Sequence, residues 1–329
     1  MPRPPSPIPF GPDTPFRVPS ARELGITRGR LRASDLEHPF RGVRIARALL
    51  GSEDSDPGAI DRASQRLILR NARAYALVMP PHAFYAGLTA VALHGLPLLD
   101  SAGARLEGLC VAVHSPARAV RGRGVDGIRV APGLASVSDV DGLRVSSPAS
   151  TWAMLADQLS LRELVILGDA IVRVPRDDRG RPRPEARLAT LGQLQAAARA
   201  PWRRGRPRLE AALASVRVGS MSPLETDYRL VTVASGLPQP QLDVEIRDAA
   251  GHLLGISDAV YAEQSVIAEV EGDHHRTLRA QWDRDIQKYA AYAAHGWEVI
   301  RLTSRHIRGP APRAAEMVRE ALLRRGWQG

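Results

Sequence analysis

Apolar and polar residues alternate most regularly in the last third of the chain. In SPLETDYRLVTVASG (222–236), apolar side chains recur with the spacing of one helix face, and Gly236 is expected to end that helix. QLDVEIRD (241–248) alternates with the two-residue period of a strand. The elements expected after it are strands at 253–261 and 265–271, a long helix at 276–295, a buried strand at 297–303 and a closing helix at 311–325. The pattern therefore predicts the order α-β-β-β-α-β-α.

The first 160 residues predict a different organisation. ARELGITRGRLRASDLEHPFRGVRIA indicates a short helix, a turn at Gly25, a second helix that opens at Thr27, and a strand-like RGVRIA. Helix, tight turn, basic helix and strand is the order of a winged helix. Further along, LCVAVHS (109–115) has the period of a strand and residues 150–173 are expected to be helical, which indicates a small α/β domain.

Proline and arginine content suggest where the domains begin and end. The opening MPRPPSPIPFGPDTPF is rich in proline, and it lacks a basic segment followed by an apolar core, so we expect a flexible arm rather than a signal peptide. The predicted division is an arm (1–19), a winged-helix and α/β region (20–160), an arginine-rich helical connector (161–219) and a C-terminal domain (220–329). The fold class predicted for the whole chain is α/β.

Length and composition limit the classes of protein that this chain can be. Its 329 residues favour about two domains, and a hydrophobic content of 44% is that of a globular protein. No apolar run approaches the roughly 18 residues needed to cross a bilayer. The single cysteine, Cys110, excludes an intrachain disulfide and lies in a predicted strand. We therefore expect a soluble, cytoplasmic protein without a membrane partner.

The net charge of +10 is unevenly distributed. From Met221 to the end there are 13 basic and 15 acidic residues, whereas Arg173–Arg208 holds 11 arginines and three acids. Basic segments of this kind can bind the phosphates of DNA, although a solvated Pro/Arg-rich linker would have the same composition. The residues predicted to contact nucleic acid are Arg28, Arg30 and Arg32 on the second N-terminal helix, and Arg203, Arg204 and Arg206 in the connector.

Three acidic residues occupy unusual places in the predicted C-terminal elements. Asp258 lies in the second strand, Glu269 in the third, and Glu225 on the preceding helix. If the two strands pair as a hairpin, the oxygens of Asp258 and Glu269 converge. Hard divalent cations such as Mg²⁺ or Mn²⁺ prefer this oxygen-only arrangement. The alternative is structural, since an acid in the first turn of a helix also favours the helix dipole.

The motif EVEGDHH (269–275) and the downstream RDIQKYAAYAAHGWEVIRLT (284–303) resemble the PD-(D/E)XK nuclease superfamily. Residues 220–326 are most similar to its very-short-patch-repair-endonuclease-like branch, which implies a restriction-endonuclease-like αβββαβ domain. The N-terminal region resembles, more loosely, the AbiEi-type antitoxins, in which a winged helix precedes a small α/β domain. The segments that carry this second resemblance are 21–46, FYAGLTAVALHGLPL (84–98) and VDGLRVSSPASTWAMLADQL (140–159).

The nuclease resemblance implies a role for each residue of the motif. Asp258 would be the principal ligand of the metal and Glu269 the second, while Glu225 would hold a water on the metal. His274 or His275 would act as acid or base. The lysine that the superfamily usually has two residues after the second acid is here Glu271, and a third carboxylate there implies either a further metal ligand or a site that no longer cuts.

Among the 45 basic residues of the chain, Lys288 is the single lysine. It lies three residues after Asp285 on the predicted helix that follows EGDHH, on the same face as Trp282. A lysine is a compact charge whose pKa can shift, whereas an arginine stays protonated. We therefore expect Lys288 to supply the cation that Glu271 does not, although one lysine on an amphipathic helix is also ordinary.

These features predict a Mg²⁺- or Mn²⁺-dependent endonuclease that hydrolyses DNA phosphodiester bonds. The predicted catalytic residues are Glu225, Asp258, Glu269, Glu271, His274, His275 and Lys288, and the predicted metal ligands are Asp258, Glu269 and Glu271. The main alternative is a DNA-binding antitoxin or transcriptional regulator in which the nuclease fold survives without catalysis. A module that pairs with a toxin or another defence-system protein is a third hypothesis.

Overall fold

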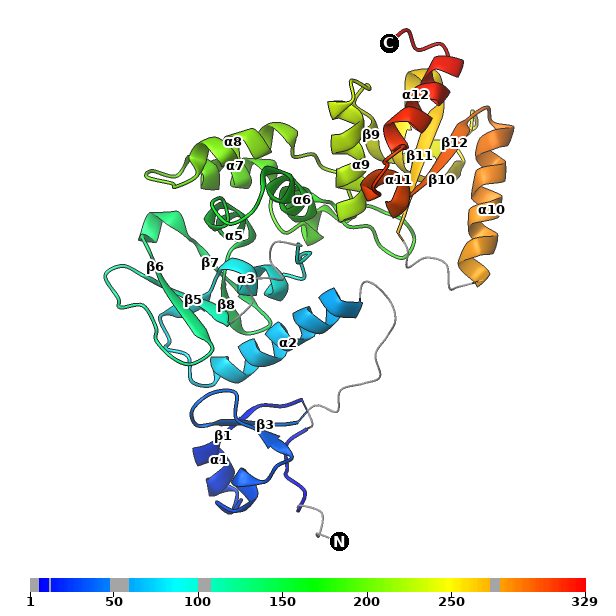
Figure 1. Ribbon diagram of the computed structural model, residues 1–329. Coiled ribbons are helices and arrows are strands. Elements are labelled where there is room, and N and C mark those ends of the chain that lie inside the picture. The colour runs from blue at the N-terminus through cyan, green and yellow to red at the C-terminus, as the bar shows by residue number, and fades with distance from the viewer. Residues whose placement is uncertain (1–5, 12, 48–58, 100–107, 273–278) are drawn as a thin grey trace. The chain divides into compact units, whose positions relative to one another are not determined.

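A computed structural model of the chain describes residues 6–11, 13–47, 59–99, 108–272 and 279–329 (Figure 1). The described residues divide into two compact units, one of Met1–Leu155 with Arg199–Arg203 and the other of Ala156–Ala198 with Arg204–Gly329. Both contain helices and sheets, which confirms the predicted α/β class. Within the described ranges, no helix combines the length and the apolar character needed to cross a membrane.

A small three-stranded sheet opens the first unit. Its strands β1 (Phe16–Arg17), β2 (Leu36–Glu37) and β3 (Val43–Ala46) follow the order β1-β3-β2, and α1 (Val18–Glu23) packs on it. Phe16, Ala21, Leu31 and Leu36 form its core.

The second N-terminal helix, expected to open at Thr27, is absent from the described structure. Only one 3-10 turn, Arg30–Arg32, forms there, and only Leu31 within it is buried. A segment that offers one apolar side chain to a small core does not bury enough surface to support a full helix. The prediction that Arg28, Arg30 and Arg32 share a helix was therefore wrong.

The rest of the first unit is a five-stranded sheet with helices. Its strand order is β6-β5-β4-β8-β7, with β4–β5 and β7–β8 antiparallel. The strands are β4 (Ala83–Tyr85), β5 (Leu109–His114), β6 (Val125–Val130), β7 (Val137–Val140) and β8 (Leu143–Ser146); the helices are α2 (Ala59–Ala76), α3 (Gly87–Leu93) and α5 (Pro148–Met154). The strand predicted at 109–115 is confirmed, and Cys110 lies on it.

The segment expected as a connector contributes helices to the second unit. These are α6 (Leu161–Val172), α7 (Leu191–Arg199) and α8 (Arg206–Ser215). Ser160 caps α6, because its hydroxyl accepts a hydrogen bond from the amide of Glu163 while the Glu163 carboxylate accepts one from the Ser160 amide. With Leu164, Ile166, Leu167 and Ile171 buried, α6 is a core helix rather than part of an exposed linker.

The C-terminal elements follow the predicted order. They are α9 (Pro223–Ala234), β9 (Gln241–Arg247), β10 (Leu253–Tyr261), β11 (Val266–Glu271), α10 (Arg279–Ala294), β12 (Glu298–Thr303), α11 (Ser304–Arg308) and α12 (Ala314–Arg324). The sheet order is β12-β11-β10-β9, with β10–β11 antiparallel and β11–β12 parallel. The helix α10 makes the crossover that two parallel neighbours require.

Helices cover both faces of this sheet (Figure 1). On one face, Ala259, Val266 and Ala268 pack with Leu224 and Tyr228 of α9 and with Val318 and Leu322 of α12. On the other face, Val260 and Ile267 pack against Tyr292 of α10. Because side chains alternate along a strand, Asp258 and Glu269 share the face of Val260 and Ile267, which is the face that α10 covers.

A buried ion pair fastens α9 to α6. Arg229 Nη2 lies 2.6 Å from Asp169 Oδ2, and the two side chains expose only 2% and 1% of their surface. Asp169 also accepts hydrogen bonds from the Thr226 hydroxyl (2.9 Å) and the Arg217 amide (2.8 Å). Burial nevertheless raises the pKa of Asp169, against the lowering effect of Arg229. The position of α9 therefore depends on a charge pair that is costly to break.

Replacing Arg229 by methionine should destabilise the protein by about 3–5 kcal/mol, because it leaves the Asp169 carboxylate buried without its counter-charge. Urea unfolding followed by circular dichroism measures the change. The double variant Asp169→Asn/Arg229→Met should recover most of the lost stability. If the two single changes simply added in the double variant, the pair would not be coupled in the way its burial implies.

Candidate functional site

The hairpin of β10 and β11 opens at the predicted acids. The last paired residues are Ala259 and Ala268, and Asp258 and Glu269 come next on the two strands. Beyond that point the Asp258 carboxylate accepts a hydrogen bond from the Val270 amide at 2.7 Å. The predicted hairpin is therefore confirmed, and Asp258 is held at the place where the two strands separate.

Lys288 reaches Glu269 from α10. Its ammonium lies 2.9 Å from Glu269 Oε1 and 3.0 Å from Oε2, and it donates a hydrogen bond to Oε2. Glu269 is buried, whereas the Lys288 side chain keeps 22% of its surface exposed. Although Oε1 is close to the ammonium, it is a buried oxygen without a properly directed hydrogen bond. The single lysine of the chain thus lies beside the second predicted metal ligand.

Two tyrosines and a glycine determine where Lys288 lies. Its ammonium is 5.6 Å from the ring centres of both Tyr289 and Tyr292. The Tyr292 hydroxyl accepts a hydrogen bond from the buried Ser257 at 3.0 Å. A Cβ atom at Gly255 would collide with that hydroxyl and lie 3.0 Å from Lys288 Cγ. A glycine on β10 is therefore needed for α10 to approach the sheet this closely.

Glu225 is buried in the first turn of α9. Ser222 caps this helix, and the Glu225 carboxylate accepts a hydrogen bond from the Met221 amide at 2.7 Å. Burial raises the pKa of Glu225 to about 7, and the negative charges of Asp243 and Glu269 add to this effect. Its position in the first turn of a helix does not explain the raised pKa of Glu225, because an exposed carboxylate at a helix N-terminus would keep a low pKa.

Asp258 is influenced by the same neighbours. Asp258 is half-buried, and its carboxylate accepts the hydrogen bond from the Val270 amide. This burial, followed by the charges of Glu225 and Glu269, holds the pKa of Asp258 well above its ordinary value, while the Val270 amide and Lys288 oppose the shift. The structure therefore brings Glu225, Asp258 and Glu269 within range of one another's charges, which the strand pattern predicted for Asp258 and Glu269 and the nuclease resemblance implied for Glu225.

Asp243 and Arg176 belong to this neighbourhood, and the sequence analysis missed both. Asp243 lies on β9 with a left-handed φ of 54°, which is rare for a residue within a strand. Arg176 Nε lies 2.9 Å from Asp243 Oδ1, and its Nη1 lies 3.1 Å from Glu245 Oε1. In the sequence, Asp243 is one position of the alternating strand QLDVEIRD and does not stand out. The two acids in DVE (243–245), together with the arginine-rich segment earlier in the chain, are the feature that could have predicted an ion pair here.

Glu271 does not join the other acids as a free ligand. Its carboxylate forms an ion pair with Arg301 of β12, whose guanidinium carbon lies 5.1 Å from the ring centre of Tyr289. The negative charge at this position is therefore already compensated within the protein. His274 and His275 lie outside the residues that the structure describes.

The oxygen-rich character of the site suits a hard cation. Mg²⁺ in enzymes commonly takes one or two carboxylates and keeps several waters. Among the residues that the structure describes, which exclude the two motif histidines, no three His, Cys, Asp or Glu side chains form a ready cage for a metal. Asp258 and Glu269 could supply two carboxylate ligands to such a cation, which would share Glu269 with the Lys288 ammonium.

The predicted DNA-binding arginines differ in how they are engaged. Arg30 forms a double hydrogen bond with Asp35 and is nearly buried, whereas Arg28 and Arg32 are exposed. In the other group, Arg203 donates to the Leu134 carbonyl at 2.6 Å, Arg204 lies 3.8 Å from Asp157, and Arg206 lies 2.9 Å from Glu210. Arg30 is thus a structural residue, while Arg204 keeps most of its surface in solvent.

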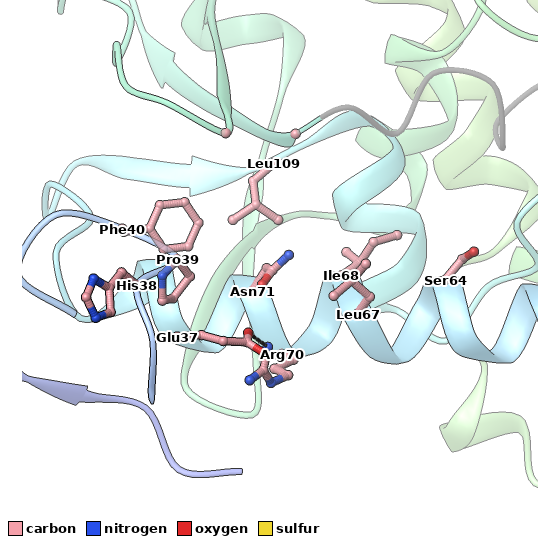
Figure 2. Close-up of a pocket in the computed structure, with 12 residues that line it drawn as sticks. Glu37, His38, Pro39, Phe40, Ser64, Leu67, Ile68, Arg70, Asn71 and Leu109 are labelled. Carbon is pink, nitrogen blue, oxygen red and sulfur yellow. Dashed lines mark hydrogen bonds and ion pairs between the residues drawn. The ribbon is translucent and has the colours of Figure 1, made fainter. Parts of the chain in front are cut away.

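A cavity of about 620 Å³ lies elsewhere, in the first unit. It is bounded by residues 37–40 after β2 and by the face of α2 that carries Ile68 and Asn71 (Figure 2). Arg70 of α2 lies 2.6 Å from Glu37 across its floor. Because the clustered carboxylates belong to the second unit, this cavity is not the candidate site.

Comparisons with known proteins identify relatives but no activity. No protein-family model matches the chain, and no solved structure matches it either. Two uncharacterized proteins, from two strains of Mycobacterium tuberculosis, are each 25% identical to it over 237 residues, which is 72% of this chain and 80% of theirs. This length exceeds either compact unit, so the similarity includes residues of both.

The raised pKa of Glu225 predicts a specific dependence of stability on pH. Since the unfolded chain releases this proton near 4.5 and the folded chain near 7, stability without divalent ions should fall by about 3 kcal/mol as pH rises through that interval. Glu225→Gln should remove this fall and therefore raise the melting temperature at pH 8 but not at pH 4. Thermal unfolding between pH 4 and 8 measures it.

Glu210→Gln on α8, which changes an exposed acid that pairs with Arg206, is the matched control and should leave the pH profile unchanged. A Glu225→Gln variant with the same pH profile as the wild type would show that Glu225 carries no raised pKa.

Proposed function

We propose that the second unit is a divalent-metal-dependent endonuclease of the PD-(D/E)XK type that hydrolyses phosphodiester bonds of DNA in the cytoplasm. The observation that carries the proposal is the meeting of Asp258 and Glu269 where β10 and β11 separate, with Lys288 paired to Glu269 and the buried Glu225 within range of both charges. Carboxylates that raise one another's pKa reduce the stability of the folded protein, so their presence together indicates a functional site. Binding of a cation would offset this cost.

Each residue has a distinct role in this proposal. Asp258 and Glu269 would hold Mg²⁺ or Mn²⁺, which would act as a Lewis acid on the phosphate and make water a better nucleophile at neutral pH. Glu225, whose pKa is raised to about 7, is suited to accept the proton of the attacking water. Lys288, fixed on Glu269, would place its ammonium against the scissile phosphate.

The arginine content supports DNA as the substrate class. Exposed Arg28, Arg32 and Arg204 are available for phosphate contacts, whereas Arg30 and Arg176 are occupied by acids of the protein. In this proposal the N-terminal region acts as a winged-helix-like, antitoxin-like module that directs the nuclease unit to DNA. Its reduced second helix leaves few side chains for reading bases in the major groove.

One observation favours a second function, that of a non-catalytic DNA-binding antitoxin or transcriptional regulator. Protein cations already face several acids of the region: Lys288 faces Glu269, Arg301 faces Glu271, and Arg176 faces Asp243. A site whose charges are compensated internally can fold without a metal. Cation binding and phosphodiester cleavage distinguish the two functions.

Binding of Mn²⁺ should stabilise the wild-type protein and should require Asp258. At a Mn²⁺ concentration 100 times the dissociation constant, linkage adds about 2.7 kcal/mol to the stability. Differential scanning fluorimetry should therefore show a higher melting temperature with Mn²⁺ for the wild type and no rise for Asp258→Ala. Glu316→Ala, at an exposed acid of α12, serves as the control and should respond like the wild type. Equal shifts in wild type and Asp258→Ala would contradict the proposed metal site.

Nicking of supercoiled plasmid in Mg²⁺ or Mn²⁺ tests the chemistry, with Lys288→Arg as the informative variant. The larger, planar guanidinium cannot take the place of an ammonium confined by Tyr289 and Tyr292, so we expect nicking to fall at least about tenfold. Arg313→Lys, at an exposed position before α12, is the control for a change of cation type. Undiminished nicking by Lys288→Arg would remove Lys288 from the mechanism, and absence of nicking in the wild type would favour the regulator.

A further inference from the structure

Trp202 is the most exposed large apolar residue that the structure describes. It lies in the loop between α7 and α8, and 94% of its surface is accessible to solvent. Its backbone has a left-handed φ of 61°, a conformation that a bulky side chain adopts only under constraint. Indole is normally among the side chains that proteins bury most effectively. An exposed indole on a strained backbone does not stabilise the fold, so we expect it to have a role in binding.

The loop is held in place on either side of Trp202. The next residue, Arg203, donates from its amide to the Ala200 carbonyl at 3.1 Å and from its guanidinium to the Leu134 carbonyl at 2.6 Å. Two residues later, Gly205 has a φ of 68°, and a Cβ atom there would lie 2.6 Å from the Ala156 Cβ. These contacts fix the backbone of the loop in a conformation that directs the indole into solvent.

Positive charge surrounds the indole along the chain. The stretch from residue 199 to residue 208 contains no acidic residue and five arginines, which are Arg199, Arg203, Arg204, Arg206 and Arg208. Arg204 exposes 91% of its side chain, with Asp157 as its nearest acid at 3.8 Å. An aromatic face beside exposed guanidinium groups is the combination with which proteins bind single-stranded nucleic acid, because the ring stacks on a base while the cations hold the phosphates.

We propose that Trp202 is a stacking platform for an unpaired base of DNA, with Arg204 holding the adjacent phosphate. The proposal rests on the DNA-binding part of the proposed function, but it requires neither the carboxylate site nor cleavage. It adds a preference for single-stranded or distorted DNA, since a base inside an intact duplex offers no free face for stacking. The chemistry that recognises the ligand is therefore an aromatic face together with a phosphate.

Fluorescence anisotropy in EDTA, with a labelled single strand and the blunt duplex of the same sequence, tests the preference. The wild type should bind the single strand more tightly, and Trp202→Ala should weaken single-strand binding by roughly 5- to 100-fold while changing duplex binding little. Trp202→Phe should retain most of the affinity because it keeps an aromatic ring. Leu323→Ala is the control, at an apolar residue that is 51% exposed and also followed by two arginines but has no ring.

Salt dependence separates stacking from phosphate contact. Arg204→Gln should flatten the slope of log affinity against log salt by about 0.7 on a single strand, whereas Trp202→Ala should lower the affinity and keep the slope. Trp202→Gly gives a second readout, because glycine relieves the left-handed backbone. This variant should melt at a higher temperature than the wild type and still bind the single strand weakly, as expected of a residue kept for binding at the expense of stability.

The proposal is overturned if Trp202→Ala binds the single strand like the wild type, or if it loses single-strand and duplex binding equally. Loss of binding by Leu323→Ala to the same degree would also overturn it, since any exposed apolar residue would then suffice. Because all these measurements exclude metal, a wild type that binds but does not nick plasmid would contradict the proposed nuclease and leave the stacking site standing.

Discussion

Electrostatic repulsion among Glu225, Asp258 and Glu269 is the constraint on which the second unit depends. The three acids come from α9, β10 and β11, and the chain brings them together although two are buried and the third is half-buried. The Lys288 ammonium of α10 pairs with one of them, Glu269. The elements that surround the acids therefore have to be held firmly, because the acids themselves favour separation.

Arginines supply much of that restraint. Arg229 holds α9 to α6 through Asp169, and Arg162 and Arg308 both bind Asp227 on the same helix. Arg176 closes on Asp243 next to the carboxylate cluster. Some guanidinium groups of this basic chain thus neutralise buried acids, while others, such as that of Arg204, remain exposed to solvent.

The carboxylate cluster and the exposed Trp202 suit different kinds of ligand. The carboxylate cluster suits a hard cation, because it offers carboxylate oxygens of Asp258 and Glu269 close to one another. The exposed Trp202 suits a flat, apolar group such as a base, with negatively charged phosphates on either side. A loop held by the hydrogen bond of Arg203 to Leu134 fixes its position. The proposed function uses both features, because cleavage of a strand requires it to be positioned as well as contacted.

The sequence by itself determined the order of the C-terminal elements, the pairing of β10 with β11, and the meeting of Asp258 with Glu269, because alternation and strand adjacency are local properties. The sequence also indicated Lys288 as a candidate site residue, because it is the single lysine of the chain. Only the tertiary structure decided that Glu271 pairs with Arg301, that Arg30 is occupied by Asp35, and that Asp243 joins the cluster. Glu271 and Arg301 lie 30 residues apart and Arg176 and Asp243 lie 67 apart, so these pairs depend on packing that no local pattern contains. The N-terminal helix expected at Thr27 failed for a related reason, since propensity predicts a helix but only a core to pack against stabilises it.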